Sequence, residues 1–309
     1  MRRKIWTGSI ALAFVMLTTT ACDVRRAIMR EIARQNETYF SPPGTVGWEV
    51  EQLTDHVYTF RWHWYRNIFV VTDEGVFATD PFNPEAAALM RDAIREKAGN
   101  KPVKYLFYTH YHKDHVEGGA LLEPEEVICH ERCAGYFKDI ASPDILSPTR
   151  TLSGSTEITL GGITLKLIYL GKTHTDTLYV VHIPQENLLF TADFGLVKTL
   201  PPIGLPDFYR PGTFRAMEQV SKLDFDTWVP SHFGHGTKKE FVEYMEMMQR
   251  LDQLVAQARE QYGRLDENLV PSFTHVYDGM KAEYGDWHGF DQMILFSFSR
   301  TATGQLLGY

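Results

Sequence analysis

The sequence predicts an α/β fold on three observations. Short runs of β-branched and aromatic residues, bounded by turn residues, indicate strands; the first three runs cover 57–60, 68–72 and 76–79. A helix follows, because Asn83 suits an N-cap, Pro84 suits the first helical position and Gly99 suits a C-terminal stop. The pair Gly161-Gly162 indicates a tight hairpin, because glycine accepts the positive φ angles of such a turn.

Further strands and helices follow in the same way. The remaining apolar runs predict strands over 103–109, 157–160, 163–170, 178–183 and 188–191. After Gly236 the apolar residues recur at helical spacing, which predicts a long helix that packs on the core; these residues are Phe241, Met245, Met248, Leu251, Val255 and Ala258. Residues 264–309 are expected to form two helices that cover a site or form a partner surface.

The N-terminus is typical of an exported protein. Basic residues precede an apolar run that is shorter than the roughly 20 residues of a membrane span, so residues 1–21 are expected to be a signal peptide. Cys22 follows small residues, as in a bacterial lipobox, although Thr19 stands where leucine is usual. Two outcomes stay open: a lipoprotein anchored to the membrane through Cys22, or cleavage near Ala21 to leave a soluble periplasmic protein. Residues 22–45 are expected to be a tether.

Composition narrows the class of partner. The chain has 309 residues, of which 44% are hydrophobic and 23% charged, as in ordinary globular proteins. A formal net charge of -8 argues against nucleic acid as a partner and leaves a small molecule as the expected one. Cys129 and Cys133 are expected to be buried thiols, with a disulfide as the alternative in an exported protein. The oligomeric state cannot be predicted.

The segment from Tyr108 to His115 is the most informative in the chain. It follows an apolar strand, and side chains two apart in extended backbone point to the same side, so His110 and His112 can reach one ion together. The chain then turns, which lets Asp114 and His115 reach a second ion. Imidazole and carboxylate are good zinc ligands. These residues therefore predict a metal site.

This H-x-H-x-D-H pattern resembles that of the metallo-β-lactamase superfamily of metallo-hydrolases, and the chain looks like an uncharacterised exported member. The resemblance implies a four-layer αββα sandwich over residues 46–262, followed by a C-terminal helical extension over 263–309. It also implies later ligands in a fixed order. His174 resembles the third histidine of the first metal, and Asp193 resembles the carboxylate that bridges both ions, although Ala192 stands where the family more often has glycine.

The last ligand expected from the resemblance has two candidates. His232 follows Pro230 at the family spacing and is the preferred one, whereas His235 lies in a Gly-His-Gly of its own. Ser231 and Phe233 replace the usual glycines beside His232, which is expected to change the local backbone.

The resemblance implies a dinuclear site with two Zn²⁺ ions, and iron or manganese are the alternative metals. The first ion would have His110, His112 and His174; the second would have Asp114, His115 and His232; Asp193 would bridge them. The two aspartates, Asp114 and Asp193, would also orient the attacking water and are the expected catalytic residues. Asp80, at the end of a strand, resembles the acid that fixes a metal ligand in this family, and a simple turn acid is the alternative.

A hairpin loop in this family often leans over the metals, and here it contains Trp62, Trp64 and Arg66. The tryptophans are expected to contact an apolar substrate and Arg66 to meet an anion; an ordinary exposed hairpin is the alternative.

The implied function is zinc-dependent hydrolysis of a small ester, thioester, lactone or amide. Three alternatives remain: an iron-dependent redox or sulfur enzyme on the same fold, a β-lactamase, or a non-enzymatic binding protein. Asp193 favours thioester hydrolases and lactonases over classical β-lactamases, which generally lack an aspartate there. Fold alone does not fix function.

Overall fold

The computed structural model describes residues 30, 34, 37–202, 208–265 and 267–308. The predicted signal peptide and Cys22 lie outside these residues, as does part of the predicted tether. The chain divides into two compact units, residues 1–43 and 44–309, and the second unit contains both sheets. None of the described helices is long and apolar enough to cross a membrane.

The first sheet has seven strands in the order β1-β2-β3-β4-β5-β6-β7. Their bounds are β1 Trp48–Gln52, β2 Val57–Trp62, β3 Tyr65–Thr72, β4 Gly75–Thr79, β5 Val103–Phe107, β6 Glu126–His130 and β7 Arg150–Leu152. Strands β1 to β4 pair antiparallel, and β4 to β7 pair parallel. All five residues of β4 are buried, as expected of a strand that is covered on both faces.

The second sheet has six strands in the order β13-β12-β11-β10-β9-β8. Their bounds are β8 Thr156–Leu160, β9 Ile163–Tyr169, β10 Tyr179–Ile183, β11 Leu188–Ala192, β12 Thr227–Pro230 and β13 Gly236–Thr237. The turn between β8 and β9 uses Gly161 and Gly162 at φ 53° and 82°, which confirms the predicted hairpin. β3 contacts β11 and β12, so the two sheets pack against each other.

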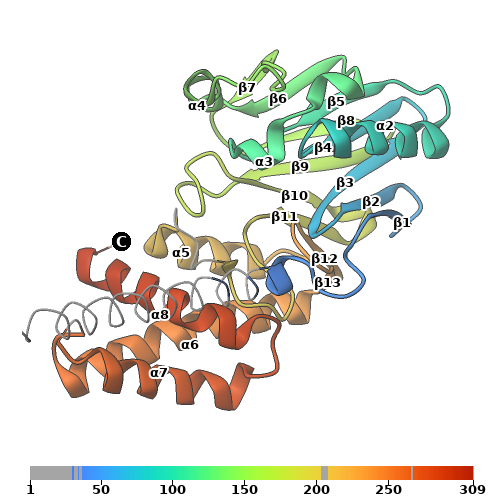
Figure 1. Ribbon diagram of the computed structural model, residues 1–309. Helices are drawn as coiled ribbons and strands as arrows, with labels where there is room; N and C mark the ends of the chain where they lie inside the picture. Colours follow the sequence, from blue (N-terminus) through green and yellow to red (C-terminus); the bar gives the residue numbers. More distant parts are fainter. Residues whose placement is uncertain (1–29, 31–33, 35–36, 203–207, 266, 309) are drawn as a thin grey trace, which may run out of the picture. The chain divides into compact units, whose positions relative to one another are not determined.

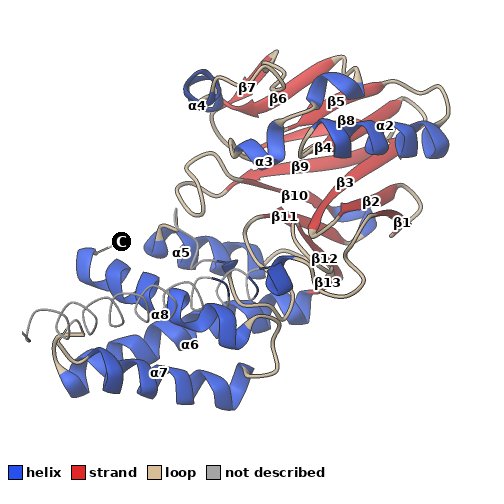
Figure 2. Cartoon of the chain, in the orientation of Figure 1, coloured by secondary structure: helices blue, strands red, loops and turns tan. Residues whose placement is uncertain are grey.

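Helices cover the outer face of each sheet, which confirms the four-layer αββα sandwich (Figures 1 and 2). On the first sheet lie α2 (Pro84–Ala98), α3 (Lys113–Val116), η1 (Gly119–Leu122) and α4 (Cys133–Ile140); η2 (Pro184–Glu186) links β10 to β11. α6 (Lys238–Tyr262) contacts β12 and β13, and α5 (Arg210–Ser221) packs on α6. The predicted caps of α2 are confirmed, because the Asn83 side chain accepts from Ala86 N and Gly99 follows the last turn.

The C-terminal residues form two helices, as predicted. α7 (Leu269–Tyr284) and α8 (Phe290–Leu307) both pack on α6, and Figure 1 shows them as a helical layer. α6 begins at a capping box of Thr237 and Glu240, which satisfies backbone N–H groups that the first helical turn leaves unpaired. Its buried face includes Phe241, Met248 and Leu251, so the predicted apolar stripe faces the interior.

Candidate metal centre

The predicted ligands gather at the carboxyl ends of four strands and on one short helix. His110 and His112 follow β5, and α3 carries Asp114 and His115. His174 follows β9, Asp193 follows β11 and His232 follows β12. Both sheets therefore contribute side chains to the same cluster.

Asp193 lies at the centre, and its two oxygens face different histidines. Oδ2 lies 3.8 Å from His110 Nε2 and 3.4 Å from His174 Nε2. Oδ1 lies 3.4 Å from His115 Nε2 and 3.1 Å from His232 Nε2. The carboxylate thus stands between two sets of donors.

Three groups of side chains have the spacing of a metal site; one is Asp80, His110 and His115, and the other two share Asp193. His110, His112, His174 and Asp193 form one group, and His115, Asp193 and His232 form the other; within each, the ligand atoms lie within 4.8 Å of one another. His112 Nδ1 lies 3.1 Å from His174 Nε2. The donor set suits zinc, because nitrogen and carboxylate oxygen are its usual protein ligands alongside thiolate.

Buried polar atoms without partners give an independent test of fit. Among the described residues, His110 Nε2, His115 Nε2 and Asp193 Oδ1 are buried and make no hydrogen bond, although Oδ1 lies close to the His232 ring. Buried polar atoms are normally paired, and an unpaired one costs about 1–3 kcal/mol. Metal ions between these atoms would satisfy all three, so the residues fit the implied group.

The charges of the cluster follow from burial and from the carboxylates. Burial lowers the pKa of His110 well below its ordinary value, with nearby His115 acting in the same direction. Burial alone would also lower the pKa of His115, but the carboxylates of Asp193 and Asp114 raise it well above its ordinary value. Burial would raise the pKa of Asp193, but His115 and His232 hold it well below its ordinary range. Asp193 is therefore an anion.

Asp80 is fully buried and contacts two of the predicted ligands, His115 directly and His110 through Thr109. Its Oδ1 accepts from Thr109 N at 2.9 Å, and its Oδ2 accepts from Thr109 Oγ1 at 2.7 Å. Because that hydroxyl gives its proton to Asp80, it accepts from His110 Nδ1, 2.9 Å away, which leaves Nε2 of His110 as a lone pair. His115 Nδ1 lies 3.4 Å from Oδ2, which places its Nε2 towards Asp193 in the same way.

Asp114 is the most open of the predicted ligands. Its side chain is 50% exposed, and Oδ2 lies 3.8 Å from His115 Nε2. The Tyr65 hydroxyl donates to the same oxygen at 3.2 Å. Burial, and then the Asp114 carboxylate, raise the pKa of Tyr65, so this phenol stays a donor. Sequence reasoning missed Tyr65, although it lies between two residues of the predicted loop, and it missed Thr109 beside His110.

The predicted hairpin loop leans on the cluster. Trp64 stacks on His232 with ring centroids 4.1 Å apart and 18° between planes, and Phe233 N donates to Trp64 O at 2.7 Å. Tyr65 and His232 form a β-bridge, which ties the loop to the end of β12. Trp62 contacts the rings of His63 and Tyr65 and packs on the core beside the first sheet.

Arg66 lies elsewhere than we expected, which corrects the interpretation that it meets an anionic substrate. Its residue is only 4% exposed, and its guanidinium donates to Phe233 O at 3.0 Å and to Thr59 Oγ1 at 3.2 Å. Glu49 pairs with it at 3.4 Å. Arg66 is therefore part of the scaffold that joins the hairpin to the β12 end.

The structure separates the two candidates for the last ligand. His232 is 5% exposed and faces Asp193, whereas His235 pairs with Glu51 at 3.0 Å away from the cluster. Phe233 has φ 62° and Ala192 has φ 48°, the left-handed region that favours glycine. The backbone thus keeps a conformation suited to glycine at two positions where this chain has other residues.

The two remaining cysteines, Cys129 and Cys133, are buried and free. This agrees with the preferred interpretation of buried thiols over a disulfide.

We expect Trp64→Ala to raise KM by about five- to tenfold and to lower kcat by less, because the ring covers the cluster and an aromatic contact contributes about 0.5–1.5 kcal/mol. Steady-state kinetics of the variant measure both constants. Trp64→Phe, which keeps a ring, serves as the control. Equal falls in kcat and kcat/KM would contradict substrate contact and indicate that Trp64 acts through His232.

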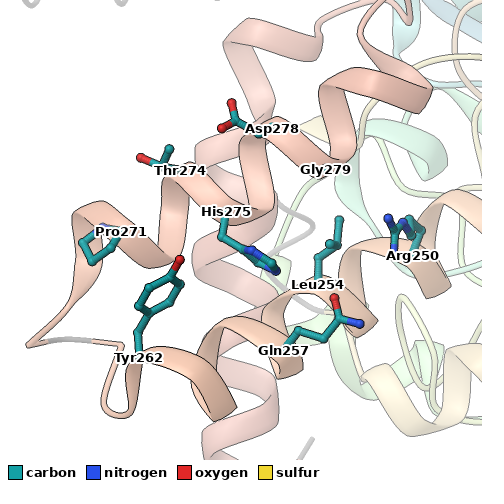
Figure 3. A pocket seen from close by; sticks show the side chains of 9 residues that line it. All are labelled: Arg250, Leu254, Gln257, Tyr262, Pro271, Thr274, His275, Asp278 and Gly279. Carbon is teal, nitrogen blue, oxygen red and sulfur yellow. The ribbon is translucent and has the colours of Figure 1, made fainter.

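A separate cavity lies between α6 and α7, far along the chain from the predicted ligands. In Figure 3 the His275 ring points towards Leu254 and Gln257, with Arg250 nearby. None of the clustered histidines or aspartates lines this cavity. We therefore place the chemistry at the cluster around Asp193.

The chain is 32% identical to 2,4-dinitroanisole O-demethylase subunit alpha of Nocardioides sp. (strain JS1661) over 209 residues, which cover 65% of this chain and 63% of that subunit. It is 26% identical to subunit beta over 269 residues, which cover 85% of this chain and 83% of that subunit. The match to subunit alpha thus spans less than two thirds of that relative.

Solved structures show the same fold. A metallo-beta-lactamase from Pontibacter korlensis superposes with a TM-score of 0.57 at 22% identity, covering 65% of this chain and 99% of that one. A stereoselective inverting sec-alkylsulfatase from Pseudomonas sp. superposes with a TM-score of 0.64 at 12% identity, covering 85% of this chain and 50% of that one. The model of the metallo-beta-lactamase superfamily matches residues 61–232, more than half of the sequence, and this chain belongs to that superfamily.

Proposed function

We propose that this protein is a dinuclear, zinc-dependent hydrolase that acts on a small ester, thioester, lactone or amide. One observation carries the proposal: the two oxygens of Asp193 face separate sets of buried donors, His110 and His174 on one side and His115 and His232 on the other. A carboxylate placed in this way suits two ions rather than one.

The ions would supply a water of lowered pKa and a Lewis acid for the substrate's oxygen. The chain's own groups do the rest. His110, His112 and His174 would hold one ion, and Asp114, His115 and His232 the other, with Asp193 shared. Asp193 and Asp114 are acceptors that orient the attacking water, and the Tyr65 hydroxyl holds Asp114 in place. Trp64 stacks on the His232 ring and would hold it in place beside Asp193.

A second candidate is hydrolytic cleavage of an activated aryl ether. It is favoured by the two relatives that are named as subunits of 2,4-dinitroanisole O-demethylase. Nitro groups make the aryl oxygen a good leaving group, so the same attacking water serves for an ether of this kind. Both candidate functions would use the same predicted metal ligands. Measuring turnover of ester and aryl ether substrates distinguishes the two functions.

We expect His232→Ala to lose about one metal ion per chain and at least about 100-fold in kcat/KM, because His232 is one of the few donors on its side of Asp193. Metal content by elemental analysis, together with turnover of lactone, thioester, aryl ester, dinitroaryl ether and β-lactam substrates, measures both effects.

His235→Ala is the matched control, because this histidine lies three residues further on and pairs with Glu51 instead. We expect it to keep two ions and normal turnover. Iron with redox activity in the wild-type protein, or no metal and no turnover, would contradict the proposal and favour the redox or the binding alternative.

A further inference from the structure

A small cavity lies between the histidine–aspartate cluster and helices α5 and α6. His174 and Asp193 line one end of it, and Phe194, Met217 and Met248 line its sides. These three apolar side chains are at most 5% exposed, so they give the cavity a buried apolar wall. It adjoins the reactive centre and is separate from the hairpin side, where Trp64 and Tyr65 lie.

A tyrosine also lines the cavity. Tyr244, on α6, lines it and is 2% exposed. Tyr244 therefore brings a phenol hydroxyl to the wall of the cavity, beside His174 and Asp193. Burial, and then the Asp193 carboxylate, raise the pKa of Tyr244, so the phenol is a neutral donor close to the cluster.

The side chains that line the cavity are flexible, and a second cavity adjoins it. In this conformation it has space for about one water molecule. Met217 and Met248 are unbranched thioethers, which change rotamer at little cost, so the cavity can widen. A second cavity, which Leu251 and Arg300 help to line, shares Phe208 and Met248 with the first. These two shared side chains separate the two spaces.

We propose that this cavity is a binding subsite for the apolar acyl or aryl group of the substrate, and that the Tyr244 hydroxyl donates a hydrogen bond to the substrate's oxygen beside it. The inference rests on the proposed hydrolytic function and adds the substrate class: a compound with a short apolar chain or ring next to the bond that is cleaved. Phe208 and Met248 set the length of chain that fits.

Carboxylates test the subsite without turnover, because they are products of ester hydrolysis and bind through oxygen. Isothermal titration of the zinc-loaded full chain with acetate, propionate, butyrate, hexanoate and octanoate measures affinity along the series. We expect the dissociation constant to fall about fourfold per methylene group for the shorter acids, since each buried methylene contributes that factor. We expect Tyr244→Phe to weaken all five acids by about three- to tenfold and to leave the chain-length trend unchanged.

Met248→Ala joins the two cavities and should extend the trend, so that octanoate binds at least about tenfold more tightly than to the wild type. Met247→Ala is the matched control, because Met247 is equally buried on the same helix but lines neither cavity. It should lose stability like Met248→Ala and leave the trend unchanged; Tm values of both variants report folding.

Two results would overturn the subsite: equal affinities from acetate to octanoate for the wild type, or the same change in trend for both methionine variants. Rising affinities without turnover of any substrate would count against the proposed hydrolysis and leave the subsite standing. Turnover with equal affinities would do the reverse.

Discussion

Asp193→Asn is expected to lower kcat/KM by at least about 1,000-fold and to reduce bound metal from the proposed two ions per chain to one or fewer. The amide keeps the shape of the carboxylate but offers a single acceptor oxygen and no charge. One of the two donor sets that now face Oδ1 and Oδ2 would then meet an N–H group, which cannot bind a cation. A bridging ligand would bind both ions. Its removal is therefore expected to lower kcat/KM and the metal content more than the removal of any single histidine.

Measuring Tm with and without added zinc shows whether Asp193→Asn loses activity because it binds less metal or because it misfolds. An ion that binds only the folded protein stabilises it, by about 4 kcal/mol at a free concentration 1,000 times the dissociation constant. We expect zinc to raise the Tm of the wild type and to have little effect on Asp193→Asn. Asp176→Asn is the control, because Asp176 pairs with Arg132 and Tyr136 outside the cluster. Two tightly bound ions in Asp193→Asn would refute the bridging role.

The parts of the fold that the sequence predicted are those where local chemistry decides the structure. The caps of α2 and the Gly161-Gly162 turn depend on residues next to one another in the chain, so their pattern is visible without knowledge of the fold. Strands such as β1 and β7 were not predicted. β1 lies at a sheet edge with mostly exposed side chains and β7 has only three residues, so neither gives a clear apolar pattern.

The candidate metal site likewise combines residues that the sequence pattern predicted with residues that only the folded structure brings together. His110, His112 and His115 are close in sequence and carry a recognisable spacing, whereas Tyr65, Thr109 and Tyr244 act through contacts that only the folded chain creates. Arg66 illustrates the opposite error. An arginine expected in a loop near a metal suggests an anion site, but Arg66 lies on β3 and pairs with Glu49 of β1, two strands away in the sheet. Pairing of that kind depends on strand register, which the sequence alone does not give.

Asp80→Ala is expected to lower the free energy of unfolding of the metal-free protein by about 3 kcal/mol. The change leaves the buried Thr109 N–H and His115 Nδ1 without their acceptor, and each unsatisfied buried group costs about 1–3 kcal/mol. Urea denaturation in the presence of a chelator measures this loss. Asn83→Ala is the matched structural control: it removes the α2 cap three residues away, should cost about 1 kcal/mol and should leave metal binding unchanged.

The effect of Asp80→Ala on the metals distinguishes a positioning residue from a purely structural one. Without Asp80, the Thr109 hydroxyl is free to donate to His110 Nδ1, and His115 Nδ1 loses its partner, so both rings can place a proton on the Nε2 atoms that face Asp193. Loss of such a supporting hydrogen bond typically weakens metal affinity about 10- to 100-fold. Because one ring lies on each side of Asp193, we expect both ions to bind more weakly in competition with a chelator. If only one ion binds more weakly, Asp80 orients a single histidine. If both ions bind as tightly as in the wild type, Asp80 contributes only to the stability of the β4 end.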